Sequence, residues 1–222
     1  MRQLAFSAGA ILRPRKLSII TSYTHEQAES SNLEAIIRAT LSEATGLALD
    51  AQMFSANAGT AAAPAGLFNG VTPLTPTAVS GSTTPAEAAA TDISNLFGAL
   101  TTNGAGKAAI IVAAVPQATR LKLIAGPQFD IDIIPSTALP AGTVAAIEVA
   151  SFVSGFDSVP AFRASRDAAI HFEDTAPADP IMSGTPVRSM YQLDAVALRM
   201  DVMAAWAMRA TGHAQFITGA LW

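Results

Sequence analysis

The chain has 222 residues, of which 50% are hydrophobic and only 14% are charged, and its mean hydropathy is +0.37. This balance excludes an intrinsically disordered protein, because disorder requires low hydrophobicity and high charge. Thirteen basic residues against 17 acidic ones leave a formal net charge of −4, which is not typical of proteins that bind nucleic acids or anionic membranes. Cysteine is absent, so disulfides, thiolate metal sites and cysteine nucleophiles are excluded.

The N-terminal residues 1–24 contain four basic residues and no acidic one. Residues 4–12 loosely resemble a signal peptide, but three basic residues follow at 13–16 with no small-residue cleavage site before them, which favours a pair of strands around a turn. Residues 16–23 are rich in Leu, Ile, Thr and Ser, which predicts a strand. The longest apolar run, 108–115, is far shorter than the roughly 20 residues that cross a membrane.

A long helix is predicted over residues 32–54. Ser31 and Glu34 have the spacing of a capping box, in which each side chain binds the backbone of the other residue. Apolar residues then recur at helical spacing as far as Ala51. Such a helix would be about 35 Å long. Gly46 lowers its intrinsic stability by about 1 kcal/mol, so tertiary packing must hold it.

The next stretch, 56–85, is rich in Ala, Gly, Thr, Ser and Pro, and a connection of this length is either functional or an extended arm. Asn69 and Gly70 within it predict a tight turn. A second capping box follows at Thr84 and Glu87, and it begins a helix that ends at an Asn-Gly pair, 103–104.

The remaining elements alternate between strands and helices. A buried strand is predicted at 108–115 and a short helix at 116–124. Short strands follow at 131–135, 144–149, 161–163 and 169–173. Residues 191–206 are rich in alanine, but their apolar residues recur every second position, so this segment is predicted to be a long strand with one apolar face.

Two patterns resemble sites of known chemistry but lack residues that the chemistry needs. The loop 104–107, Gly-Ala-Gly-Lys, resembles the end of a phosphate-binding loop. However, Ala108 stands where Ser or Thr is required, and the loop leads into a strand, so a loop that ends a helix is favoured. His25 and Glu26 resemble a zinc-protease helix, but Glu29 stands where the second histidine is needed.

No other side chains form a recognisable site in the sequence. His171 and His213 lie on different predicted elements, and no serine has the surroundings of a hydrolase nucleophile. The acidic pairs Asp130 with Asp132 and Glu173 with Asp174 are predicted to lie in solvated loops. We therefore predict no catalytic, cofactor-binding or metal-binding residues and no enzymatic activity. Strong structural signals without catalytic ones indicate a protein that assembles.

Several segments resemble segments of the major capsid protein of tailed bacteriophages, both in their amino-acid sequences and in their order along the chain. Encapsulin shells share the Hong Kong 97 phage capsid fold of that protein. Residues 46–54 are similar to the end of the family's long spine helix, and 64–69 to its "P-x-G-[IL]-x-N" turn. Residues 110–116 with Leu121 and Leu123 resemble its strand, proline and leucine helix. Residues 133–142 resemble its "V-x-x-S-x-x-L-P-x-G" hairpin, and 191–203 its closing strand. The resemblance spans about residues 16–218.

The resemblance implies an α+β fold with a long spine helix, a peripheral domain and an axial domain. Residues 1–84, with the spine helix at about 32–54, would form the first part of the peripheral domain. Residues 85–188 would form the axial domain, and 189–222 the closing strand of the peripheral domain. Family members carry an N-terminal arm and an extended loop before the position of Arg2, which this sequence lacks, and weaker assembly is expected without their contacts.

The function that follows from the resemblance is a non-enzymatic subunit of an icosahedral phage or prophage capsid, which self-assembles around DNA. Its partners would be copies of itself in pentamers and hexamers, with a scaffolding protein, a portal and a maturation protease as further candidates. Specific nucleic-acid recognition, membrane binding and cofactors are not expected. The protein would be found in virions assembled in the host bacterial cytoplasm. The alternatives are an encapsulin-like compartment shell and a small hydrolase with dispersed catalytic residues.

Overall fold

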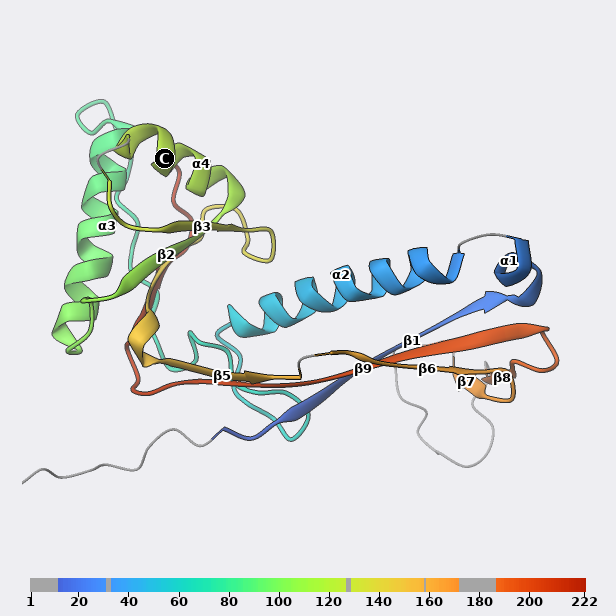
Figure 1. Ribbon diagram of the computed structural model, residues 1–222. Coiled ribbons are helices and arrows are strands. Elements are labelled where there is room, and N and C mark those ends of the chain that lie inside the picture. The colour runs from blue at the N-terminus through green and yellow to red at the C-terminus, as the bar shows by residue number, and fades with distance from the viewer. Residues whose placement is uncertain (1–11, 31–32, 127–128, 158, 172–186) are drawn as a thin grey trace, which may run out of the picture. The chain divides into compact units, whose positions relative to one another are not determined.

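A computed structural model describes residues 12–30, 33–126, 129–157, 159–171 and 187–222, and its helices and strands are mixed along the chain (Figure 1). In chain order they are β1 (Arg15–Thr24), α1 (His25–Ser30), α2 (Leu33–Met53), α3 (Pro85–Thr102), β2 (Ala109–Ala114), α4 (Val115–Ala125), β3 (Ile133–Ser136), β4 (Val144–Glu148), the 3₁₀ helix η1 (Val149–Ser151), β5 (Phe152–Phe156), β6 (Ala161–Ser165), β7 (Ala169–His171), β8 (Val187–Ser189), β9 (Ala195–Met208) and β10 (Ala214–Ile217). Among the described residues, no helix is both long and apolar enough to cross a membrane.

The described chain divides into two compact units. Unit 1 contains Leu47–Gly155 and Ala204–Trp222, and unit 2 contains Lys16–Gly46 and Phe156–Met203. Both α2 and β9 therefore have residues in each unit. The bounds of the units differ from those of the predicted peripheral and axial domains. Those domains are defined by positions in a shell, so their assignment stays a prediction.

The two elements predicted nearest the N-terminus are confirmed. The strand predicted at 16–23 is β1, and the long helix predicted at 32–54 is α2. The capping residue Ser31 and the strand pair expected before residue 12 lie outside the described residues. Helix α1, which has six residues and directly follows β1, was not expected from the sequence.

Unit 1 contains a four-stranded sheet with the strand order β10-β4-β2-β3. Strand β2 is antiparallel to β4, with Ile111 opposite Ala146, and parallel to β3, with Val112 opposite Ile134. The hairpin expected at 133–142 is therefore wrong: β3 and β4 lie on opposite sides of β2 instead of pairing with each other. The turn before β4 does form, with Gly142 at a φ of 83°, and Ala220 binds its backbone carbonyl at 2.9 Å.

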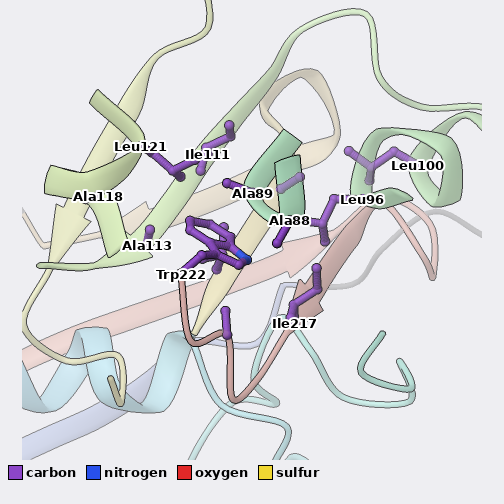
Figure 2. Packing of buried hydrophobic residues seen from close by; sticks show 13 residues of the cluster. Ala88, Ala89, Leu96, Leu100, Ile111, Ala113, Ala118, Leu121, Ile217 and Trp222 are labelled. Atoms are coloured by element: carbon purple, nitrogen blue, oxygen red, sulfur yellow. The ribbon is translucent and has the colours of Figure 1, made fainter. Parts of the chain in front are cut away.

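Strand β2 is buried on both faces, which explains why its sequence is apolar without alternation. Ile111 and Ala113 face the first core cluster, together with residues of α3, α4 and the C-terminal Trp222 (Figure 2). Val112 and Ala114 belong to a second cluster, which includes Phe68 and Phe216, whose rings stack at 4.4 Å. Helices and the C-terminus thus cover one face of the sheet, and the connection that follows α2 covers the other.

Helix α3 begins as its sequence predicts. Thr84 accepts a hydrogen bond from the Glu87 amide, and the Glu87 carboxylate accepts one from the Thr84 amide at 2.8 Å. These Thr84 hydrogen bonds, the backbone one first, lower the pKa of Glu87 below its usual value. Pro85 occupies the first turn, where its missing N–H removes no helical hydrogen bond.

The long connection between α2 and α3 packs closely against the rest of unit 1. The amide of Leu67 donates to the carbonyl of Met53, which holds the start of the connection against the end of α2. Further along, Leu74 donates to the Phe216 carbonyl. The Thr77 amide and hydroxyl both donate to the buried carboxylate of Asp92 on α3, at 2.8 and 2.6 Å.

Unit 2 consists of strands covered on one side by the first part of α2 (Figure 1). Strand β9 lies between β1 and β6 and is antiparallel to β6. Its even-numbered side chains from Val196 to Val202 are all buried, as the two-residue period predicts. The hydroxyl of Thr45 on α2 lies 3.8 Å from the sulfur of Met200, so this apolar face is the one that packs against α2.

The long strand begins four residues later than predicted. Residues 191–194 form a turn, in which the Ala195 amide donates to the Met190 carbonyl and Asp194 has a φ of 46°. A strand cannot continue through this left-handed conformation. The strands β5, β8 and β10 were not predicted. Each is short, and its sequence alone has no alternation that indicates a strand; each is a strand because it pairs with a neighbour.

Candidate functional site

The loop that resembles a phosphate-binding loop already holds an anion from its own chain. The Glu148 carboxylate accepts hydrogen bonds from the amides of Gly106 and Ala108, and Glu148 is buried. An external phosphate would have to displace this side chain from a core position. In this structure the loop connects α3 to β2, and its amides at Gly106 and Ala108 bind Glu148.

Of the three histidines, His213 makes the contact of greatest chemical interest. Its Nδ1 lies 2.6 Å from the Ser151 hydroxyl, and its Nε2 lies 3.1 Å from the carbonyl of Asn103. A carbonyl oxygen only accepts, so Nε2 carries a proton, and in the neutral imidazole Nδ1 accepts from the serine hydroxyl. This is the pairing of a serine nucleophile with its base, which the sequence alone did not reveal.

The burial of Ser151 and His213, and the Asn103 carbonyl that His213 also contacts, indicate that the Ser151–His213 hydrogen bond has a structural role. Ser151 is 4% exposed and His213 is 7% exposed, so little of either side chain is open to a substrate. The partner of Nε2 is a neutral carbonyl instead of the carboxylate that stabilises an imidazolium in hydrolases. The contact links η1 and the turn before β10 to the end of α3.

The other predicted candidates do not converge. His25 begins α1 in unit 2, and the side chain of His171 lies outside what the structure describes. Asp130 and Asp132 are exposed, as expected for a solvated loop, whereas Glu173 and Asp174 fall outside the described residues. Within the described parts of the chain, no group of three or more His, Asp or Glu residues could hold a metal ion.

Two exposed surfaces remain as candidates for function. The first is an apolar groove of about 440 Å³ between α3 and α4 in unit 1. Its walls include Ile93 and Phe97 of α3, Leu121 and Ile124 of α4, and Phe129 after α4. Exposed apolar surface of this kind is typical of a contact with another protein.

The second surface lies in unit 2, on the side of the sheet opposite α2. We call it the outer sheet face; it comprises Lys16, Ser18 and Ile20 of β1, Arg163 of β6, and Arg199, Asp201 and Met203 of β9. Contacts between neighbouring strands show that these side chains share one face. Ser18 donates to Asp201 at 2.5 Å, and Arg163 lies directly opposite Arg199 in the β6–β9 register.

Asp201 is the centre of the polar contacts on this face. Its carboxylate accepts from the Ser18 hydroxyl and from Arg199 Nε at 2.9 Å, and it pairs with Lys16 Nζ at 3.3 Å. The Ser18 hydrogen bond, followed by those from Arg199 and Lys16, lowers the pKa of Asp201 to about 2. These contacts tie β1 to β9, so the charge on Asp201 stabilises the sheet of unit 2.

We expect Asp201→Asn to lower the stability of unit 2 at neutral pH. Because folding lowers the pKa of Asp201, its contribution is complete above the unfolded value of 3.8 and is lost as the pH falls toward 2. The measurement is the urea midpoint of wild type and variant by far-ultraviolet circular dichroism between pH 7 and 2. The gap between the two midpoints should close between pH 4 and 2.

The control for this measurement is Asp167→Asn, which removes an exposed carboxyl group of the same unit that forms no ion pair among the described residues. Its midpoint should follow that of the wild type at every pH. A gap for Asp201→Asn that is unchanged down to pH 2 would show that the carboxylate does not hold the strands together.

Comparison with known proteins identifies the fold. No family model matches the sequence, and no curated protein matches it significantly. Solved structures do match. A chain of Mycobacterium phage Bobi has a TM-score of 0.68 at 13% identity, covering 93% of this chain and 72% of that one. A chain of the satellite phage P4 procapsid has a TM-score of 0.55 at 8% identity, covering 98% and 75%.

A third match comes from the capsid of an empty GTA particle, with a TM-score of 0.56 at 12% identity; it covers 98% of this chain and 78% of that chain. Identities this low establish the fold and not the activity. The chain has the fold of phage capsid proteins, and the predicted α+β class is confirmed.

Proposed function

We propose that this chain is the structural subunit of an icosahedral phage or prophage capsid shell, which self-assembles around DNA from copies of itself. The observation that carries the proposal is the match of nearly the whole chain to chains of a P4 procapsid and a GTA capsid, at 98% coverage in both cases. The first of these structures is a procapsid and the second is the capsid of an empty particle. No observation of comparable weight favours an encapsulin-like compartment.

The chemistry of the described residues supports a structural role without enzymatic activity. Three buried polar side chains have their hydrogen-bonding partners inside the protein. Glu148 binds backbone amides, Asp92 binds Thr77 and Trp222, and His213 binds Ser151. The surfaces that remain open are an apolar groove and a sheet face, which suit contacts with other protein subunits.

We also propose a location and further partners for the protein. The subunits would form pentamers and hexamers and become part of the virion, after assembly in the cytoplasm of a host bacterium. A scaffolding protein, a portal and a maturation protease are further proposed partners. Contact with the packaged DNA would be indirect or nonspecific, because the chain carries a net charge of −4.

The test is sedimentation velocity combined with negative-stain electron microscopy of the purified chain over a range of protein concentrations. We expect closed particles, rings or flat sheets with a regular repeat, in equilibrium with smaller species. Regular spacing distinguishes assembly from aggregation, which gives irregular clumps. A monomer at every concentration, with no ordered particles on the grid, would contradict the proposal.

A further inference from the structure

Two arginines lie directly opposite each other on the outer sheet face. In the antiparallel pair of β6 and β9, Arg163 is the register partner of Arg199. Side chains at such positions have Cβ atoms about 5 Å apart, and like charges there destabilise the sheet. Arg163 is exposed, and no hydrogen bond or ion pair holds it among the residues that the structure describes.

Among the described residues that define this face, Asp201 supplies the one carboxylate, which cannot neutralise both arginines. Asp201 already binds Ser18, Lys16 and Arg199. Lys16, Arg163 and Arg199 therefore carry three positive charges around one negative charge. Because the whole chain has a net charge of −4, the outer sheet face has the opposite sign to the rest of the protein.

The surroundings of this cluster are typical of an interface. The side chains of Lys16 and Arg199 are 46% and 44% exposed, so their charges are accessible. Ile20 and Met203, on the same face, are 51% and 43% exposed. Apolar groups beside arginine are the composition found at the buried centres of protein–protein contacts.

The guanidinium group indicates the chemistry of the partner. Its planar donors match a carboxylate through two parallel hydrogen bonds. A second copy of this chain can supply carboxylates, since acidic residues outnumber basic ones and several described acidic side chains are exposed without an ion pair, including Glu43 on α2. Three cations on an acidic protein are few for binding nucleic acid, whose affinity grows with the number of phosphates neutralised.

We infer that the outer sheet face is a docking surface for the acidic surface of a second copy, and that Arg163, opposite Arg199, is the residue that receives its carboxylate. The inference rests on the proposed function, because it names one contact of the shell. It also explains why the sheet retains two opposed arginines, since an incoming carboxylate removes their repulsion.

The first test is Arg163→Glu, examined with wild type by sedimentation velocity and negative stain. Two like charges brought together at an interface weaken association, so the concentration needed for assembly should rise at least about tenfold. Arg163→Gln should give a smaller rise. The control is Arg209→Glu, which makes the same substitution at an exposed residue of unit 1 and should assemble like wild type.

Unfolding of the variant by urea separates loss of docking from loss of folding, because Arg163→Glu removes a repulsion and should leave unit 2 at least as stable as before. Assembly of Arg163→Glu at wild-type concentrations would overturn the inference and leave the proposed function standing. A wild-type chain that never assembles would overturn both. If Arg163→Glu weakens retention of a duplex DNA fragment and not assembly, the face binds nucleic acid and the inference is wrong.

The second test identifies the partner directly. Arg163→Lys chains labelled with ¹⁴N and ¹⁵N are mixed, allowed to assemble and treated with a carbodiimide, which joins a lysine amine to a carboxylate in contact with it. Mass spectrometry should find cross-links from position 163 to an Asp or Glu in peptide pairs of mixed isotope. Cross-links from position 163 found within single copies alone, or none at all in assembled material, would contradict docking between copies.

Discussion

Replacement of Asp92 by alanine should lower the free energy of unfolding of unit 1 by about 3 kcal/mol or more, because one buried and two half-buried donors lose their acceptor together. The Asp92 side chain is fully buried on α3. Its Oδ1 accepts from the Thr77 amide and hydroxyl, and its Oδ2 accepts from the indole Nε1 of Trp222 at 2.6 Å. One carboxylate thus joins α3, the long connection and the C-terminal residue.

The measurement is urea unfolding followed by tryptophan fluorescence, which reports on unit 1 because both tryptophans, Trp206 and Trp222, belong to it. The control is Asn95→Ala, an exposed change on the same helix that should alter stability by less than about 0.5 kcal/mol. If Asp92→Ala unfolds at the same urea concentration as Asn95→Ala, the three hydrogen bonds do not contribute as the structure implies.

A similar loss in the free energy of unfolding is expected from Gly66→Ala, in the turn that follows α2. A Cβ atom at this position would lie 2.0 Å from the carbonyl oxygen of Ser55 and 2.6 Å from its carbonyl carbon. Both atoms belong to the backbone, so the chain itself must move. That movement would disturb the hydrogen bonds from Gly66 to Asn57 and from Phe68 to Ser55, and with them the buried ring of Phe68. We expect a loss of about 3 kcal/mol or more.

Gly98→Ala is the matched control for this prediction. Gly98 lies within α3, and nothing is within 4 Å of where its Cβ would be. Alanine is the better helix former, so this variant should be up to about 1 kcal/mol more stable than wild type. Urea unfolding by tryptophan fluorescence measures both variants. Equal stabilities for the two alanine variants would show that the contact between Gly66 and Ser55 does not restrict the chain.

Gly66 also explains one of the resemblances found in the sequence. The sequence of segment 64–69 resembles a turn of phage capsid proteins, and the structure supplies a physical reason for its glycine. The turn folds back onto the end of α2, and only a residue without a side chain allows the two backbones to approach. The next two residues, Leu67 and Phe68, then enter the second core cluster.

Local signals predicted most of the regular elements. The capping box at Thr84 and Glu87, the helical spacing after Leu33 and the two-residue period of 191–206 are properties of neighbouring residues, so they can be recognised without a structure. The hairpin expected at 133–142 failed for the opposite reason. Which strands pair depends on the rest of the sheet, and β2 lies between the two strands that were expected to pair.

The candidate surfaces were less predictable than the fold. Nothing local in the sequence brings Ser151 to His213, which are 62 positions apart, or Glu148 to the loop at Gly106. The same holds for Arg163 and Arg199. Each occurs in an ordinary strand, and only the register of β6 with β9 sets them opposite each other.

The sequence by itself determined the α+β class, the places of the main helices and strands, and the absence of any recognisable catalytic motif, because each depends on composition or on short-range spacing. Only the tertiary structure decided the sheet order, the use of buried polar side chains as internal ligands, and the charged face of unit 2. Those features depend on contacts between residues far apart in the chain, which a single sequence does not encode in any local pattern.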